Sequence, residues 1–128
     1  MSSRAAWLAA LAGVAVLLLG MRAFLDPIAA SAGFGLPMHT DSETTFVRIY
    51  GARNVLLGAV ALAFLALRMV RPLTLLFALA TVLPLLDAVV IVSRIGIGQE
   101  LFRHAVILLA LAIVSLSLWR STRSQPAR

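Results

Sequence analysis

Four long apolar stretches limit what this chain can fold into more than any other feature of its sequence. They cover residues 7–25, 46–67, 73–92 and 101–119. A helix rises about 1.5 Å per residue, so about 20 residues cross a hydrocarbon core of about 30 Å. Charged residues make up only 12% of the chain, against about 25% in soluble domains. The sequence therefore predicts an all-α integral membrane protein, an antiparallel four-helix bundle whose first partner is the lipid bilayer.

The connection after the first stretch begins with a helix-stop signal. Pro27 disfavours helical backbone at Asp26, which predicts that the first helix ends there. The connection 28–38 has small and apolar residues, so we expect it in the headgroup layer or folded into the mouth of the bundle. An alternative is a cleaved signal peptide with its site at residues 30–32. That site lies far beyond the apolar core, which favours the membrane span.

Two local patterns predict where the second and third helices begin and bend. Thr40 and Glu43 fit a capping box, in which each side chain accepts from the other's backbone N–H, so the second helix starts near Asp41. Pro84 lies inside the third stretch and cannot donate a backbone hydrogen bond, so we expect a kink before Asp87. Residues 1–119 are expected to form one transmembrane domain, followed by a basic, disordered tail over 120–128.

The basic residues are unevenly distributed between the two sides of the predicted bundle. All 11 are arginine, and the net charge is +6. In so apolar a chain, this charge indicates membrane orientation rather than binding to nucleic acid. Four spans place both termini on one side, together with six arginines and no acid, against four arginines on the other side. The excess predicts that both termini are cytoplasmic. The six are Arg4, Arg68, Arg71, Arg120, Arg123 and Arg128.

Two opposite charges lie inside different apolar stretches. Arg53 comes seven residues after Phe46, about 10 Å below the membrane boundary at helical rise. Asp87 comes six residues before Ser93, about 9 Å below the same boundary. Because consecutive helices run in opposite directions, both charges reach the same level. An ion pair would remove most of the cost of burying either charge, so we predict that the two meet.

The residues around Arg53 define a candidate site. At about 100° per residue, Tyr50, Arg53 and Asn54 share one arc of the helix, whereas Arg48 points almost the opposite way. We assign Arg48 to headgroups or to another helix. An adjoining stripe that includes Gly51 and Gly58 lets a neighbouring helix approach closely. The predicted ligand-binding set consists of Tyr50, Arg53, Asn54, Asp87 and His104.

His104 and the acidic connection have competing interpretations. His104 could act as an acid, a base or a proton relay, or it could be an interfacial histidine bonded to Glu100 or to headgroups. His39, Asp41 and Glu43 alternate in a way that could bind a cation, but capping already uses Asp41 and Glu43, so we predict no metal. No phosphate loop, carboxylate pair or nucleophile motif is present. We therefore predict no cofactor and identify no catalytic residue, and enzymatic activity stays an open question.

Three segments carry a resemblance to a known family. They are Phe34-Gly35-Leu36-Pro37, the stretch 46–54 that ends in Tyr50-Gly51-Ala52-Arg53-Asn54 with Gly58 beyond it, and Pro84-Leu85-Leu86-Asp87-Ala88. Over most of its length the chain resembles a family of small bacterial and fungal integral membrane proteins known only as a domain of unknown function. It is more distantly similar to DoxX-like four-helix membrane proteins. The resemblance implies a four-helix membrane bundle and no established activity, and we expect the chain in a bacterial inner membrane. Some DoxX-like proteins are described as subunits of quinone-linked oxidoreductases, but this chain lacks a recognisable residue set for such a cofactor.

Three functions compete on these grounds. The polar set could bind a small lipophilic or anionic-headed molecule in the outer half of the bundle. The pair of Arg53 and Asp87 could instead only lock two helices together in a structural or accessory subunit, packed against a membrane partner or a second copy of the chain. The third is a small proton-coupled exporter, which needs an unpaired membrane carboxylate. Asp87 lies on a different helix from the one expected of such exporters and is predicted to be paired, so this function ranks lowest.

Overall fold

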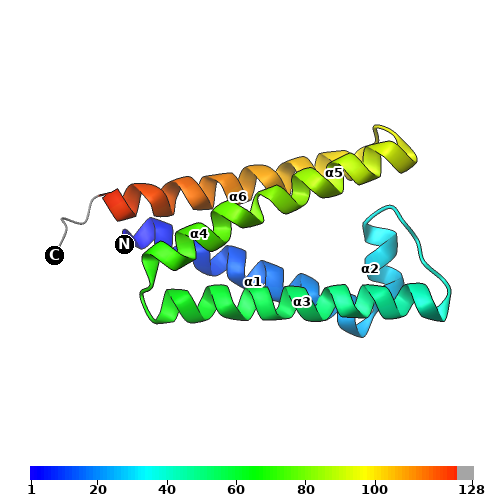
Figure 1. Ribbon diagram of the computed structural model, residues 1–128, viewed down its shortest axis with the longest axis horizontal. Coiled ribbons are helices and arrows are strands. Elements are labelled where there is room, and N and C mark those ends of the chain that lie inside the picture. Colours follow the sequence, from blue (N-terminus) through cyan, green and yellow to red (C-terminus); the bar gives the residue numbers. More distant parts are fainter. Residues whose placement is uncertain (124–128) are drawn as a thin grey trace. The chain divides into compact units, whose positions relative to one another are not determined.

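The computed structural model describes residues 1–123, and these residues form helices and connections without a strand. Figure 1 shows the elements in order along the chain. Four segments are long and apolar enough to cross a membrane, and α4 and α5 together make the third of them. The all-α, four-span prediction is therefore confirmed. The helices are α1 (Ser3–Leu25), α2 (Pro27–Gly33), α3 (Asp41–Ala66), α4 (Val70–Ala80), α5 (Val82–Ile95) and α6 (Gln99–Arg123).

Most apolar side chains on these helices face outward. Within the four apolar segments, only 22% of the first and 17% of each of the others is buried by the protein itself. A soluble protein does not leave so much contiguous apolar surface in water. Helices also satisfy their own backbone hydrogen bonds, as a lipid environment demands. The chain is thus an integral membrane protein, with lipid around its helices.

The last helix is longer than the sequence predicted. α6 continues through Arg120–Arg123, whereas we expected the helix to end at Trp119. The guanidinium of Arg123 lies 4.0 Å above the ring of Trp119, at the i, i+4 spacing that places two side chains on one helix face. The rest of the predicted tail lies outside the described residues, and the single domain over 1–119 stays a prediction.

The chain divides into two compact units, which we describe separately. The first, here called the glycine unit, is Gly13–Leu62. The second, called the terminal unit, consists of Met1–Ala12 together with the chain from Ala63 onward.

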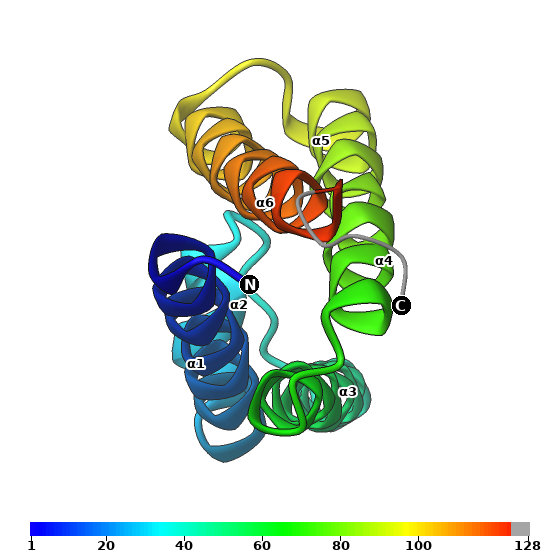
Figure 2. The same cartoon turned by 90° about the vertical axis from the view of Figure 1, so that its left-hand side faces the viewer.

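In the glycine unit, the backbones of α1 and α3 touch along antiparallel helices (Figures 1 and 2). A Cβ atom on Gly51 would lie 2.6 Å from the carbonyl oxygen of Gly20, and one on Gly20 would lie 2.5 Å from the backbone nitrogen of Val55. About two turns further along α3, a Cβ on Gly58 would lie 2.7 Å from the Cβ of Leu17. The predicted close approach at Gly51 and Gly58 is confirmed, and the partner helix is α1.

The connection after α1 holds a short helix that the sequence pattern did not predict. α1 ends at Leu25, as the Asp26-Pro27 signal predicted, and Asp26 then caps α2 by accepting from the Ala29 N–H at 3.1 Å. The side chain of Ser31 is buried. Its hydroxyl donates to the Ile28 carbonyl at 2.8 Å and accepts from the Met38 N–H at 3.1 Å. One serine therefore ties the following loop back onto α2, and Met38 packs there against a small core of Ala23, Ala30 and Val47.

The predicted capping box at the start of α3 is confirmed in both directions. The Thr40 N–H donates to Oε2 of Glu43 at 3.0 Å, and the Glu43 N–H donates to Oγ1 of Thr40 at 3.3 Å. The hydroxyl of Thr40 also donates to the same carboxylate oxygen at 2.8 Å. Two otherwise unsatisfied helix N–H groups are thus paired, and the helix begins at Asp41, where the pattern placed it.

In the terminal unit, α4 and α5 pack against α6 around a core that includes Leu73, Phe77 and Leu118. The break between α4 and α5 falls at Thr81. Pro84 lacks the N–H that would bond to residue 80, so the predicted interruption is confirmed.

A tight turn joins α3 to α4. Arg68 has a φ of +56°, its N–H donates to the Leu65 carbonyl at 3.0 Å, and the Met69 N–H donates to the Phe64 carbonyl at 2.8 Å. This pattern is a Schellman motif. An arginine here occupies the left-handed position where glycine is the usual residue.

Candidate functional site

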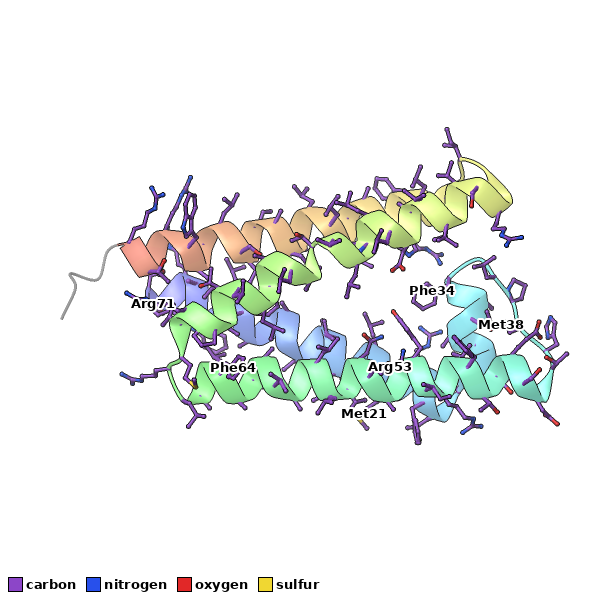
Figure 3. All side chains as sticks on the ribbon, viewed as in Figure 1. Met21, Phe34, Met38, Arg53, Phe64 and Arg71 are labelled. Carbon is purple, nitrogen blue, oxygen red and sulfur yellow. The ribbon has the colours of Figure 1, made fainter. Side chains whose placement is uncertain are left out.

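Arg53 lies midway along α3 (Figure 3). It is twelve residues beyond Asp41, or about 18 Å along the helix axis. Its side chain is exposed, and among the described residues of the glycine unit it makes no hydrogen bond or ion pair. An arginine stays charged at any accessible pH. A charge at this depth of a span is costly unless water, a polar group or an anion lies beside it.

Tyr50 lies one turn before Arg53 and contacts the loop that follows α2. Its ring centroid is 5.6 Å from that of Phe34, and the two ring planes meet at 84°. Gly35 has a φ of +79°, a conformation that a side chain disfavours, and it turns the chain directly after Phe34. An edge-to-face aromatic pair of this kind contributes about 0.5–1.5 kcal/mol beyond the area it buries. It holds the loop against the α3 face from which Tyr50 projects.

Phe34 is therefore a neighbour of the candidate site that the predicted set omitted. Figure 3 shows Phe34 and Met38 over the N-terminal half of α3. The apolar residues of the connection 28–38 were the signal that could have found it, because they predicted a segment either in the headgroup layer or folded into the bundle mouth.

Asn54 and Arg48 border the contact between α1 and α3. The backbone of Asn54 lies against Gly20, and the residue is partly buried. Arg48 points to the other helix, where its Nη1 donates to the Phe24 carbonyl at 3.1 Å. That carbonyl is among the last four of α1, which have no partner within their own helix. Of the two predicted partners of Arg48, headgroups or another helix, the structure confirms another helix, which is α1. Arg48 therefore does not belong to the candidate site.

Asp87 and His104 both belong to the terminal unit. Asp87 lies on α5 and is partly buried, and His104 lies on α6 and is only 4% exposed. The helices that carry these two residues, α5 and α6, pack against each other. A ring so completely buried has little surface left for lipid headgroups, so that alternative for His104 does not fit. The other alternative is a hydrogen bond from His104 to Glu100. It stays a prediction, because the side chain of Glu100 is outside the described residues.

The five predicted site residues fall into two sets. Tyr50, Arg53 and Asn54 belong to α3 in the glycine unit, whereas Asp87 on α5 and His104 on α6 belong to the terminal unit. The ion pair between Arg53 and Asp87 stays a prediction. Among the described side chains, which exclude that of Glu100, no three His, Asp or Glu residues gather where they could hold a metal ion.

The comparisons with known proteins give one match. The model of a family described as a domain of unknown function, DUF4267, matches residues 13–118. The match covers all five residues of the predicted site. No curated protein and no solved structure matches the chain. The more distant similarity to DoxX-like proteins stays a prediction.

Proposed function

Because this chain belongs to the DUF4267 family of domains of unknown function, its role has to be inferred from its residues, and we propose that it binds a small lipophilic molecule with an anionic head. The observation that carries this proposal is Arg53. Its guanidinium lies at mid-span on α3 without a bonding partner among the described residues of its own unit. An apolar molecule with a carboxylate or phosphate head would supply the missing anion, and its tail would match the apolar faces of the helices.

The neighbours of Arg53 have complementary roles in this proposal. The phenol of Tyr50 and the amide of Asn54 provide hydrogen bonds beside the guanidinium. Asp87 would hold the far side of Arg53, as its matching depth in the sequence predicts, and His104 would orient Asp87. These roles describe binding, and no chemical step on the ligand is proposed.

A direct binding assay tests the proposal. The probe is 11-(dansylamino)undecanoic acid, with its methyl ester as the uncharged analogue, added to the purified chain in a neutral detergent. Exciting the tryptophans and recording dansyl emission restricts the signal to probe bound to protein. A charge-assisted hydrogen bond contributes about 1.5–3 kcal/mol, so the acid should bind at least about tenfold more tightly than the ester.

Two variants separate this site from general attraction to a basic protein. Arg53→Gln should remove the preference for the acid. Arg22→Gln removes another exposed arginine of the glycine unit and should leave the preference unchanged. Equal binding of acid and ester by the unmodified chain, or equal loss in both variants, would overturn the proposal.

The structural alternative makes a different prediction about the same charges. Losing one partner of a buried ion pair costs about 3–5 kcal/mol, whereas replacing both with apolar residues is often neutral. If the pair only locks helices, Asp87→Asn should fail to accumulate in membranes, and Arg53→Leu combined with Asp87→Leu should restore accumulation. If Asp87 serves a ligand site, Asp87→Asn should accumulate normally and bind the probe differently.

The orientation of the chain in the membrane is a second part of the proposal. We propose that both termini face the cytoplasm of a bacterial inner membrane, since six arginines and no acid lie on that predicted side. Single cysteines placed at residues 2 and 39 of this cysteine-free chain would test it. An impermeant maleimide applied to intact cells should label position 39 and spare position 2.

A further inference from the structure

One end of the terminal unit gathers exposed arginines from three parts of the chain. Figures 1 and 2 show the start of α1, the connection from α3 to α4 and the end of α6 at this end, and Figure 3 marks Arg71 there. All five side chains are exposed. We call this set the arginine end, and its members are Arg4, Arg68, Arg71, Arg120 and Arg123.

Specific contacts hold these segments together. The backbone N–H of Ser2 donates to Oγ of Ser121 at 3.4 Å, and the two serine hydroxyls are also 3.4 Å apart. Directly beneath them, Ala5 is 1% exposed and Leu118 is fully buried. The first turn of α1 is thus fixed to the last turns of α6, which brings Arg4 to the same end as Arg120 and Arg123.

The turn between α3 and α4 adds the other two arginines. The Schellman motif fixes Arg68 at φ +56°, and Arg71 follows in the first turn of α4, which packs on α6. Val70 between them is 8% exposed and anchors the turn in the core. The arginine end is therefore built on ordered helix ends rather than on a long loop.

The acidic residues of the terminal unit lie far along the chain from these arginines. The terminal unit has two acids in its sequence, Asp87 and Glu100. Asp87 follows Arg71 by 16 residues, or up to about 24 Å along the helices, and Glu100 precedes Arg120 by 20 residues, or about 30 Å. Both separations exceed the screening length of about 8 Å in physiological salt. The described side chains at this end therefore carry a net positive charge.

The neighbouring tryptophans indicate that the partner is a lipid headgroup. Trp7 is 69% exposed and Trp119 is 47% exposed, and each lies within about one turn of an arginine at this end. Exposed tryptophan at the end of a span is typical of the membrane interface. The arginines beyond it then lie at the depth of the phosphates, which the planar guanidinium binds through two hydrogen bonds.

We propose that the arginine end is a binding surface for anionic phospholipids, which it concentrates from the surrounding leaflet. A basic cluster beside a membrane span attracts anionic headgroups, and each arginine near the surface adds to the attraction. This surface includes neither Arg53 nor Asp87, so it is independent of the ligand site proposed above.

The two tryptophans of the chain are built-in reporters, because both lie at the arginine end. The full chain is reconstituted in symmetric vesicles of phosphatidylcholine containing dibrominated phosphatidylglycerol or, separately, the same fraction of dibrominated phosphatidylcholine. Bromine quenches tryptophan fluorescence only at short range, so the ratio of quenching measures the lipid next to this end. Symmetric vesicles make the result independent of protein orientation.

We expect phosphatidylglycerol to be enriched on the order of a few fold over phosphatidylcholine, with the enrichment falling at high salt. The double variant Arg4→Gln, Arg71→Gln should bring the ratio close to one. The matched double variant Arg22→Gln, Arg94→Gln removes the same charge elsewhere and should keep the enrichment. Circular dichroism checks that both variants keep their helix content.

Two outcomes would overturn the proposal. Equal quenching by the two brominated lipids in the unmodified chain would show that this end has no preference for an anionic headgroup. An equal fall of the ratio in both double variants would assign the enrichment to net charge rather than to this surface.

Discussion

Adding one methyl group at Gly51 tests the backbone contact between α1 and α3. In the structure, the new Cβ would lie 2.6 Å from both the Gly20 carbonyl oxygen and the Phe24 nitrogen, and 2.9 Å from the Ala23 carbonyl carbon. Ordinary van der Waals contact begins at 3.4 Å. The two helices must therefore separate by about 0.8 Å (3.4 minus 2.6), because the obstructing atoms are backbone and cannot rotate away.

That separation affects the whole crossing, since Gly58 and Leu17 are in equally close contact further along. Overpacking a rigid core costs about 1–3 kcal/mol, and a gap of 0.5–1 Å forfeits a quarter to a half of each dispersion contact. We expect Gly51→Ala to destabilise the protein by about 2–3 kcal/mol. Adding Gly20→Ala to it should cost less than the sum of the two changes, since the helices have already moved apart.

The assay is equilibrium unfolding in mixed micelles, in which the fraction of dodecyl sulfate is raised and helix content is followed by circular dichroism. The matched control is Gly33→Ala, because a Cβ there meets nothing within 4 Å. It should be neutral, or stabilising by up to about 1 kcal/mol. Equal midpoints for Gly51→Ala and Gly33→Ala would refute the argument that the two backbones touch.

Three further predictions use other parts of the chain. Asp87→Asn should leave the protein in membranes and weaken binding of the dansyl fatty acid, and loss of the protein from membrane fractions on immunoblots would favour the helix lock. Arg68→Gly should stabilise the protein by about 0.5–1 kcal/mol, because glycine adopts the left-handed backbone of this turn without strain. Arg68→Ala keeps the Cβ and should not stabilise it. Equal midpoints of the two variants in the micelle titration would count against this explanation. Thr40→Ala should cost about 1 kcal/mol because the helix loses its N-cap, whereas Ser42→Ala in the same turn should be close to neutral, and a similar cost for both would contradict the capping box.

Lipid exposure explains why some tertiary features were hard to predict. In water, an amphipathic helix shows which face it buries. Here most side chains on both buried and lipid-facing surfaces are apolar, and the glycines were the better signal of helix contact. They marked Gly51 and Gly58 as a contact face, but nothing in the pattern named α1 as the partner. The edge-to-face contact of Phe34 with Tyr50 was likewise missed, because it depends on a loop that α2 and Ser31 position.

The sequence by itself determined the membrane class, the four spans, the capping box at Thr40 and the break caused by Pro84. Each of these depends on local chemistry, such as a run of apolar residues, a pair of side chains one turn apart or a missing N–H. Only the tertiary structure decided that Gly20 meets Gly51, that Arg48 caps the end of α1 and that His104 is buried. Those contacts join residues far apart in the chain, and their energies come from shape and close packing, which apolar patterning alone does not encode.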